Sequence, residues 1–148
     1  MSRRNGFTLI EMLMVVVVIS LASLVALPKF RSAVNRSNML SARAKVMASF
    51  SAARATAAGS GRMAVLHVGG NTVWVSATPR LKTTGSGTLD TIVIPQSLNS
   101  MYGVTATNTV DSVLIDQTGL GRNASNIVLS HGYLRDTIKI SRYGRVMK

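Results

Sequence analysis

The sequence GFTLIEMLMVVVVISLASLVALPKF, from Gly6 to Phe30, determines how this chain is organised. Between Phe7 and Leu27 its only charged residue is Glu11. As a helix rising about 1.5 Å per residue, this run would span roughly 30 Å, the thickness of the hydrocarbon core of a bilayer. Arg3 and Arg4 precede the run, which predicts that the short N-terminal end stays cytoplasmic. We therefore expect one membrane-spanning helix, with the rest of the chain across the membrane.

Glu11 is a charged residue inside an apolar segment that is long enough to span a membrane, so its presence has to be explained. A charge at the centre of a spanning helix costs about 2.5–3.5 kcal/mol on insertion scales, and less near the edge. Cleavage after Gly6 would supply a reason, because the new amine of Phe7 and the Glu11 carboxylate would then share one helix end, where the helix dipole also favours negative charge. Between chains, the Glu11 carboxylate could pair with the amine of a neighbour and set how far two helices slide past each other.

A conventional secretory signal peptide is the first alternative for this segment. Such a peptide has a basic head, a shorter apolar run and a small-residue cleavage site after it. Here the run is longer, no Ala-x-Ala site occurs around Val25–Pro28, and Glu11 interrupts the apolar core. These features favour a helix that stays in the mature protein.

The segment resembles the class III signal of type IV pilins and type II secretion pseudopilins. Glycine, the run Phe-Thr-Leu-Ile-Glu and the apolar stretch occur together in that order. The resemblance implies that prepilin peptidase cuts after Gly6 and that Phe7 becomes the N-methylated terminus. It also assigns Glu11 to filament assembly and Pro28 to the helix-disrupting proline of these subunits. An ordinary signal anchor with a chance glutamate is the alternative.

An amphipathic continuation of the helix is expected over residues 28–58. Pro28 lacks an N–H and should loosen or kink the helix. Apolar residues then recur at helical spacing and predict one packing face, made of Phe30, Val34, Leu40, Ala44, Met47, Phe50 and Ala57. Lys29, Arg36 and Arg43 are spaced by seven and fall on another face. Gly59 and Gly61 mark the end of the helix.

Residues 59–148 alternate like β-strands, with segments rich in Val, Ile and Thr between Gly, Pro, Asn and Ser. The predicted strands cover residues 62–68, 71–77, 90–95, 102–108, 112–117, 126–131 and 136–141. Gly69, Gly70 and Asn71 predict a hairpin turn, and residues 80–88 predict a loop. Trp74, on a sheet face, is expected in the core. The predicted class is α+β, with a long N-terminal helix packed on a small antiparallel β-sheet or two-sheet sandwich head.

The composition favours anionic partners and offers little chemistry. The formal net charge is +12, from 17 Lys and Arg against five acids, which suits phospholipid heads, nucleic acid or acidic protein faces. Solubility and charge balance with neighbouring subunits are the alternative. There is no cysteine, and neither histidine has a second one at metal-ligand spacing. We expect no metal, no cofactor and no enzymatic activity. GLGRNA (119–124) partly matches a dinucleotide-binding pattern. A predicted strand follows it where that pattern needs a helix, so a turn is predicted.

The end of the chain, LRDTIKISRYGRVMK, with IDQTGLGRNASNIVLS upstream, resembles the head of the GspH/FimT group of minor pilins and pseudopilins. Some type IV pilus members of this group bind DNA through a C-terminal Gly-Arg-x-Arg motif, whose second arginine is Met147 here. Basic residues near this end could contact phosphates without reading bases, and Tyr143 could stack on a base. They are Arg135, Lys139, Arg142, Arg145 and Lys148. A solvated sheet edge that blocks unwanted pairing is the alternative.

These features together predict a minor pilin or pseudopilin of a type IV pilus-like filament, processed by prepilin peptidase and N-methylated. Residues 1–6 would be the cleaved leader, 7–27 the transmembrane and filament-core helix, 28–58 its amphipathic continuation and 59–148 the periplasmic head. Its partners would be other pilins or pseudopilins, the peptidase and the inner membrane. A DNA-binding minor pilin for DNA uptake is the second reading. The sequence leaves open whether the filament serves type II secretion, a type IV pilus or competence.

Overall fold

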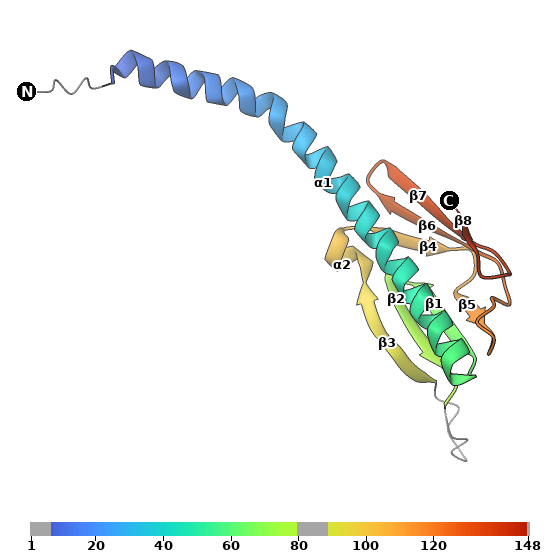
Figure 1. Ribbon diagram of the computed structural model, residues 1–148. Coiled ribbons are helices and arrows are strands. Elements are labelled where there is room, and N and C mark those ends of the chain that lie inside the picture. Colours follow the sequence, from blue (N-terminus) through green and yellow to red (C-terminus); the bar gives the residue numbers. More distant parts are fainter. Residues whose placement is uncertain (1–6, 80–88, 148) are drawn as a thin grey trace, which may run out of the picture. The chain divides into compact units, whose positions relative to one another are not determined.

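The computed structural model describes residues 7–79 and 89–147. The chain divides into two units, Met1–Asn35 and Arg36–Lys148, which are described one at a time. Gly6 and Lys148, and the loop predicted over residues 80–88, lie outside the described residues. Figure 1 labels the helices and strands along the chain.

The first unit contains the beginning of α1 (Leu9–Ser60). The helix starts after Thr8, whose hydroxyl accepts a hydrogen bond from the Glu11 amide at 3.3 Å and so satisfies one free donor of the first turn. Pro28 lies inside α1, and the kink expected there stays a prediction. The hydroxyls of Ser20 and Ser23 donate to carbonyls four residues earlier, which satisfies them within the apolar helix.

The surface of this first part of α1 is apolar and exposed. Every large apolar side chain between residues 7 and 27 is exposed, from Leu9 at 84% to Val15 and Val17 at 48%. By length and composition, α1 can cross a membrane, and none of its most apolar stretch is buried within the chain. So large an apolar surface requires lipid or protein around it.

In the second unit, the end of α1 packs on two antiparallel sheets of four strands (Figure 1). One sheet has the order β3-β2-β1-β5 and the other β4-β6-β7-β8. The first contains β1 (Ala64–Gly69), β2 (Thr72–Ala77), β3 (Asp90–Ser97) and β5 (Ser112–Ile115). The second contains β4 (Thr105–Asn108), β6 (Ser125–His131), β7 (Leu134–Ile140) and β8 (Val146–Met147). The predicted fold class is confirmed.

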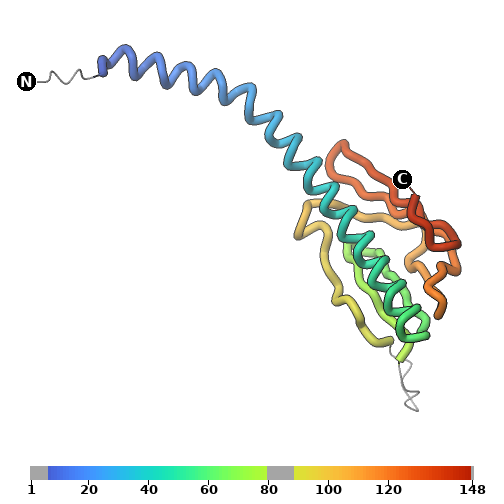
Figure 2. The backbone as a smooth tube through the Cα atoms, in the orientation of Figure 1, coloured from blue at the N-terminus to red at the C-terminus, as the bar shows by residue number. Residues whose placement is uncertain are grey.

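One core lies between α1 and the inner faces of both sheets, and the backbone tube in Figure 2 shows the helix running along them. The fully buried side chains include Leu66 on β1, Ile127 on β6 and Ile138 on β7. Trp74 does not join this core, contrary to the prediction. It is half-buried on the opposite face of β2, because its neighbours Val73 and Val75 point inward at 0% exposure.

The face that α1 buries differs from the predicted one. Its buried residues are Met39, Ala42, Val46, Ser49, Phe50, Ala53 and Ala57, so only Phe50 and Ala57 were predicted correctly. Leu40 is instead 58% exposed and Met47 37% exposed. Alanine and serine at four of the seven buried positions allow the helix backbone to approach the sheets closely, and Leu40 and Met47 lie beside this contact rather than in it.

The predicted hairpin turn is confirmed between β1 and β2. Gly70 and Asn71 have φ values of 57° and 63°, the two consecutive positive values that a tight type I′ turn needs. The Asn71 side chain also accepts a hydrogen bond from the Ala106 amide of β4 at 3.1 Å. This turn therefore links the two sheets as well as reversing the chain.

Two short elements were not predicted. The helix α2 (Leu98–Tyr102) begins after Ser97, whose hydroxyl accepts from the Ser100 amide, and ends at Gly103 with a φ of 65°. The strand predicted over residues 102–108 therefore begins only at Thr105. The strand β8 has two residues, too few for a sequence pattern, and pairs with the end of β7.

Candidate functional site

The N-terminal end of α1 carries the first group of candidate residues. Phe7 is exposed, and Glu11 lies in the first turn of the helix, where the helix dipole favours a carboxylate. Within residues 7–79 and 89–147 the ion pairs are Arg43–Asp136 and Arg62–Asp90, so the described part of the chain provides no cation for Glu11.

The basic candidates near the C-terminus lie on the hairpin of β7 and β8. Arg135 and Lys139 alternate with inward-facing residues along β7 and are exposed on the outer face of its sheet. Arg142 and Arg145 are exposed in the turn that joins the two strands. Four residues of strand separate Arg135 from Lys139 by about 13 Å, so these cations are spread out and do not form one cluster.

A hollow of ≈ 450 Å³ brings part of this group together with a second loop. Its lining includes Arg142 and Tyr143 from the β7–β8 turn, and Asp116, Leu120 and Arg122 from the loop after β5. Arg122 was missed from the sequence, although it lies within GLGRNA, because that stretch was judged only as a dinucleotide pattern. The turn predicted there is confirmed, since Asp116 and Leu120 close it by a backbone hydrogen bond of 2.8 Å.

Asp116 organises the loop that carries Arg122. Its carboxylate accepts hydrogen bonds from the Thr118 hydroxyl at 2.6 Å and from the Thr118 and Leu120 amides at 2.9 Å each. The bond from the Thr118 hydroxyl, followed by that from the Leu120 amide, lowers the pKa of Asp116. The carboxylate therefore stays ionised and fixes the loop chiefly through these hydrogen bonds, and the nearby charge of Arg122 also lowers its pKa.

Arg54 of α1 holds both loops of the hollow. Its Nε donates to the Gly119 carbonyl at 2.9 Å and its Nη1 to the Gly144 carbonyl at 3.3 Å. A side chain at Gly121 would come within 3.3 Å of the Arg142 carbonyl, which shows how closely the two loops approach. The position of Arg142 and Tyr143 therefore depends on the helix beneath them.

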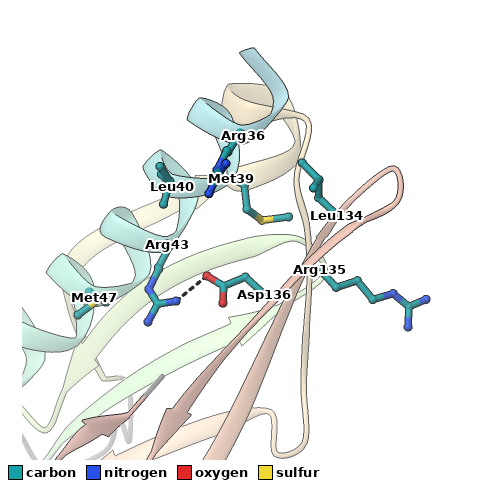
Figure 3. Close-up of a pocket in the computed structure, with 8 residues that line it drawn as sticks. All are labelled: Arg36, Met39, Leu40, Arg43, Met47, Leu134, Arg135 and Asp136. Carbon is teal, nitrogen blue, oxygen red and sulfur yellow. Dashed lines mark hydrogen bonds and ion pairs between the residues drawn. The ribbon is translucent and has the colours of Figure 1, made fainter. Parts of the chain in front are cut away.

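A second concave surface, of ≈ 500 Å³, lies between α1 and β7. Arg43 reaches from the helix to Asp136 and pairs with it at 2.6 Å, and Leu134 points toward the helix while Arg135 points away from it (Figure 3). Leu40 and Met47, about one turn before and one turn after Arg43 on the helix, give the surface its exposed apolar part. Arg36 lies at its end.

No metal-binding arrangement is present in the part of the chain that the structure describes. Within residues 7–79 and 89–147, no three His, Cys, Asp or Glu side chains lie close enough together to hold a metal ion. His67 stacks on Trp74 and contacts the Ser76 hydroxyl at 2.8 Å, and His131 contacts the Gly103 carbonyl at 2.6 Å. Both histidines thus have structural partners.

The N-terminal segment and the fold are each similar to those of known proteins. Residues 1–27 match the prokaryotic N-terminal methylation motif. The fold is similar to that of the type IV minor pilin FimU of Pseudomonas aeruginosa, strain PAO1, in two crystal forms. The first match has a TM-score of 0.59 at 15% identity and covers 76% of this chain and 88% of FimU. The second has a TM-score of 0.55 at 15% identity and covers 73% and 90%.

No curated protein matches the chain at a significant level. The methylation motif and the pilin-like fold are nevertheless confirmed. Membership of the GspH/FimT group stays a prediction. The assignments of Gly6, Phe7, Glu11 and Pro28 also stay predictions, and the match to residues 1–27 includes the first three of these positions.

Proposed function

We propose that the chain is a minor pilin or pseudopilin, a subunit of a type IV pilus-like filament. The observation that carries this proposal is a methylation motif at residues 1–27 on a pilin-like fold whose apolar N-terminal helix surface is exposed. Prepilin peptidase cuts after Gly6 and the amine of Phe7 is methylated. Before assembly, the helix spans the inner membrane and the head lies in the periplasm.

Assembly follows from the two features of the first part of α1. In lipid the apolar side chains are satisfied, so helices associate by packing against one another rather than by escaping water. An unpaired carboxylate in that environment is costly, and pairing it with a cation removes much of the cost. Glu11 therefore selects a neighbour whose amine at Phe7 lies at the same level and fixes the step between subunits.

Intact mass spectrometry of the protein extracted from membranes tests the processing step. The expected mass is that of residues 7–148 with one added methyl group, and a Gly6→Val variant should keep the whole leader because the peptidase needs the small residue before the cut. A full-length mass for the unaltered protein, in cells with an active prepilin peptidase, contradicts the proposal. The neighbouring genes then distinguish secretion, pilus and competence systems.

Glu11→Gln tests the assembly step separately from processing. The variant keeps the shape of the helix but loses the charge, so it should be processed and methylated normally yet be absent from sheared filaments. Glu11→Asp, which keeps the charge, is the matched control and should retain part of the incorporation. Normal incorporation of Glu11→Gln would remove the role of this carboxylate in assembly.

DNA binding is the second candidate function, and the hollow beside the β7–β8 turn favours it. Arg122 and Arg142 with the exposed ring of Tyr143 provide phosphate contacts and a stacking surface from two loops. Full-length protein in detergent should bind short duplex DNA with an affinity that falls steeply with salt. Arg145→Ala and Arg122→Ala should each weaken binding and reduce the salt slope. Absence of binding at low salt would remove this candidate.

A further inference from the structure

The α1 surface beside β7 carries regularly spaced side chains that lie outside the buried face of α1. Arg36, Leu40, Arg43 and Met47 follow one another at steps of four, three and four residues, which places them on one stripe of the helix. This stripe is adjacent to the buried face of α1 and is continued by Leu134 across the groove. A stripe with this spacing matches the side chains of a second helix laid along it.

The charges of the stripe define what such a helix must carry. Arg43 is already neutralised by Asp136 at 2.6 Å, so it needs no further anion. Arg36 has no ion pair within residues 7–79 and 89–147. The exposed apolar surface between them belongs to Leu40 and Met47. The complementary helix therefore has apolar residues facing Leu40 and Met47 and a carboxylate facing Arg36.

A second copy of this chain does not provide that helix. Between residues 28 and 58 α1 carries six basic residues and no acid, so two such helices repel each other. Three of the four acids of the head are engaged: Asp90 pairs with Arg62, Asp136 pairs with Arg43, and Asp116 accepts three hydrogen bonds within its own loop. The fourth, Asp111, is exposed in the bend before β5 and does not lie on a helix. Glu11 of a second copy is the carboxylate that the proposed function uses for helix bundling.

We propose that Arg36, Leu40 and Met47 of α1, together with Leu134 of β7, form a docking groove for an acidic amphipathic helix of a different subunit. The chain is then an obligate minor component, because its own helices repel one another along this surface and acidic neighbours have to separate its copies. This inference rests on the proposed function as a filament subunit, and it adds the chemistry of the neighbour.

Photo-crosslinking of the full-length protein in its own cells tests the groove. A benzophenone amino acid at Leu40 should form an adduct with another protein, and the crosslinked peptide should be a helix carrying acidic residues at spacings of three or four. The same amino acid at Ser41, which is exposed and about 100° further round the helix, is the matched control and should give little of this adduct. An adduct with a second copy, with lipid or with nucleic acid overturns the proposal, as does equal yield at both positions or no adduct at all.

The charge of Arg36 gives a second, independent readout. Arg36→Glu should lower the Leu40 adduct about tenfold or more, because a carboxylate then faces a carboxylate, whereas Arg36→Lys should retain it. Undiminished yield in Arg36→Glu overturns the proposal. Trp74 fluorescence on unfolding verifies that each variant folds. The intact mass of the same sample reports cleavage after Gly6, so a failure of processing is distinguished from a failure of docking.

Discussion

Arg43 on α1 and Asp136 on β7 form an ion pair, with 2.6 Å between Nη1 and Oδ2. The two residues are 93 positions apart in the sequence, so the pair fixes the helix to the sheet that contains β7 and β8. Their side chains retain 15% and 26% of their accessible surface. At this burial, water screens the pair only in part, and each charge depends on the other.

Removing one member of this pair should destabilise the head. Asp136→Asn or Arg43→Met should lower the free energy of unfolding by about 1–3 kcal/mol, because the remaining group keeps a partly desolvated charge without its partner. Urea unfolding of the full chain in detergent, followed by the fluorescence of the single tryptophan, Trp74, measures the change.

The pair Arg62–Asp90 is the control for that experiment. Its distance is 2.9 Å, but the Asp90 side chain is 51% exposed. Asp90→Asn should therefore cost less than about 1 kcal/mol, as exposed ion pairs do. Equal costs for the two pairs would show that burial does not set the strength of the Arg43–Asp136 pair.

Arg54→Ala should loosen both loops of the hollow. The substitution removes the hydrogen-bond donors to the Gly119 and Gly144 carbonyls. The free energy of unfolding should fall by about 1–3 kcal/mol, because the carbonyls are left unsatisfied. Hydrogen exchange measured by mass spectrometry should accelerate in peptides from both loops and remain unchanged in β1 and β2. Arg54→Lys, which can replace one of the two bonds, should give an intermediate result. Unchanged exchange at Gly144 would mean that the turn holds itself through Ser141.

Gly103→Ala tests the close approach between the end of α2 and His131. The glycine has a φ of 65°, and a Cβ there would lie 2.9 Å from Cε1 of His131. Gly132 has a similar φ of 60° but no atom within 4 Å of its Cβ position. Gly132→Ala should therefore cost about 1–2 kcal/mol from the left-handed conformation alone, and Gly103→Ala should cost more. Equal losses of unfolding free energy would mean that the His131 ring moves aside freely.

How much of the fold and of the candidate site the sequence predicts depends on how far apart in the sequence the interacting residues are. The apolar run, the long helix and the hairpin at Gly70–Asn71 follow from neighbouring residues, and all three are confirmed. The buried face of α1 was misjudged because large apolar residues were given more weight than Ala42 and Ala53, whose small size is what permits close packing. Arg122 and Arg142 are 20 positions apart, and only the folded loops bring them to one hollow.

His67 should make the stability of the head depend on pH. Burial lowers the pKa of His67 below its usual value of about 6.5. Between the lowered pKa of the folded chain and the usual pKa of the unfolded chain, the unfolded chain binds the proton more readily. The free energy of unfolding is therefore constant above about pH 6.5 and decreases as the pH falls toward the lowered pKa.

Phenylalanine in place of His67 can keep the stacking on Trp74, whose ring lies 4.7 Å away with an interplanar angle of 6°. His67→Phe should therefore abolish the loss of stability between pH 7.5 and about 5, above the range in which carboxylates titrate. Urea unfolding at several pH values measures this loss, and an unchanged pH slope in His67→Phe would assign it to another group.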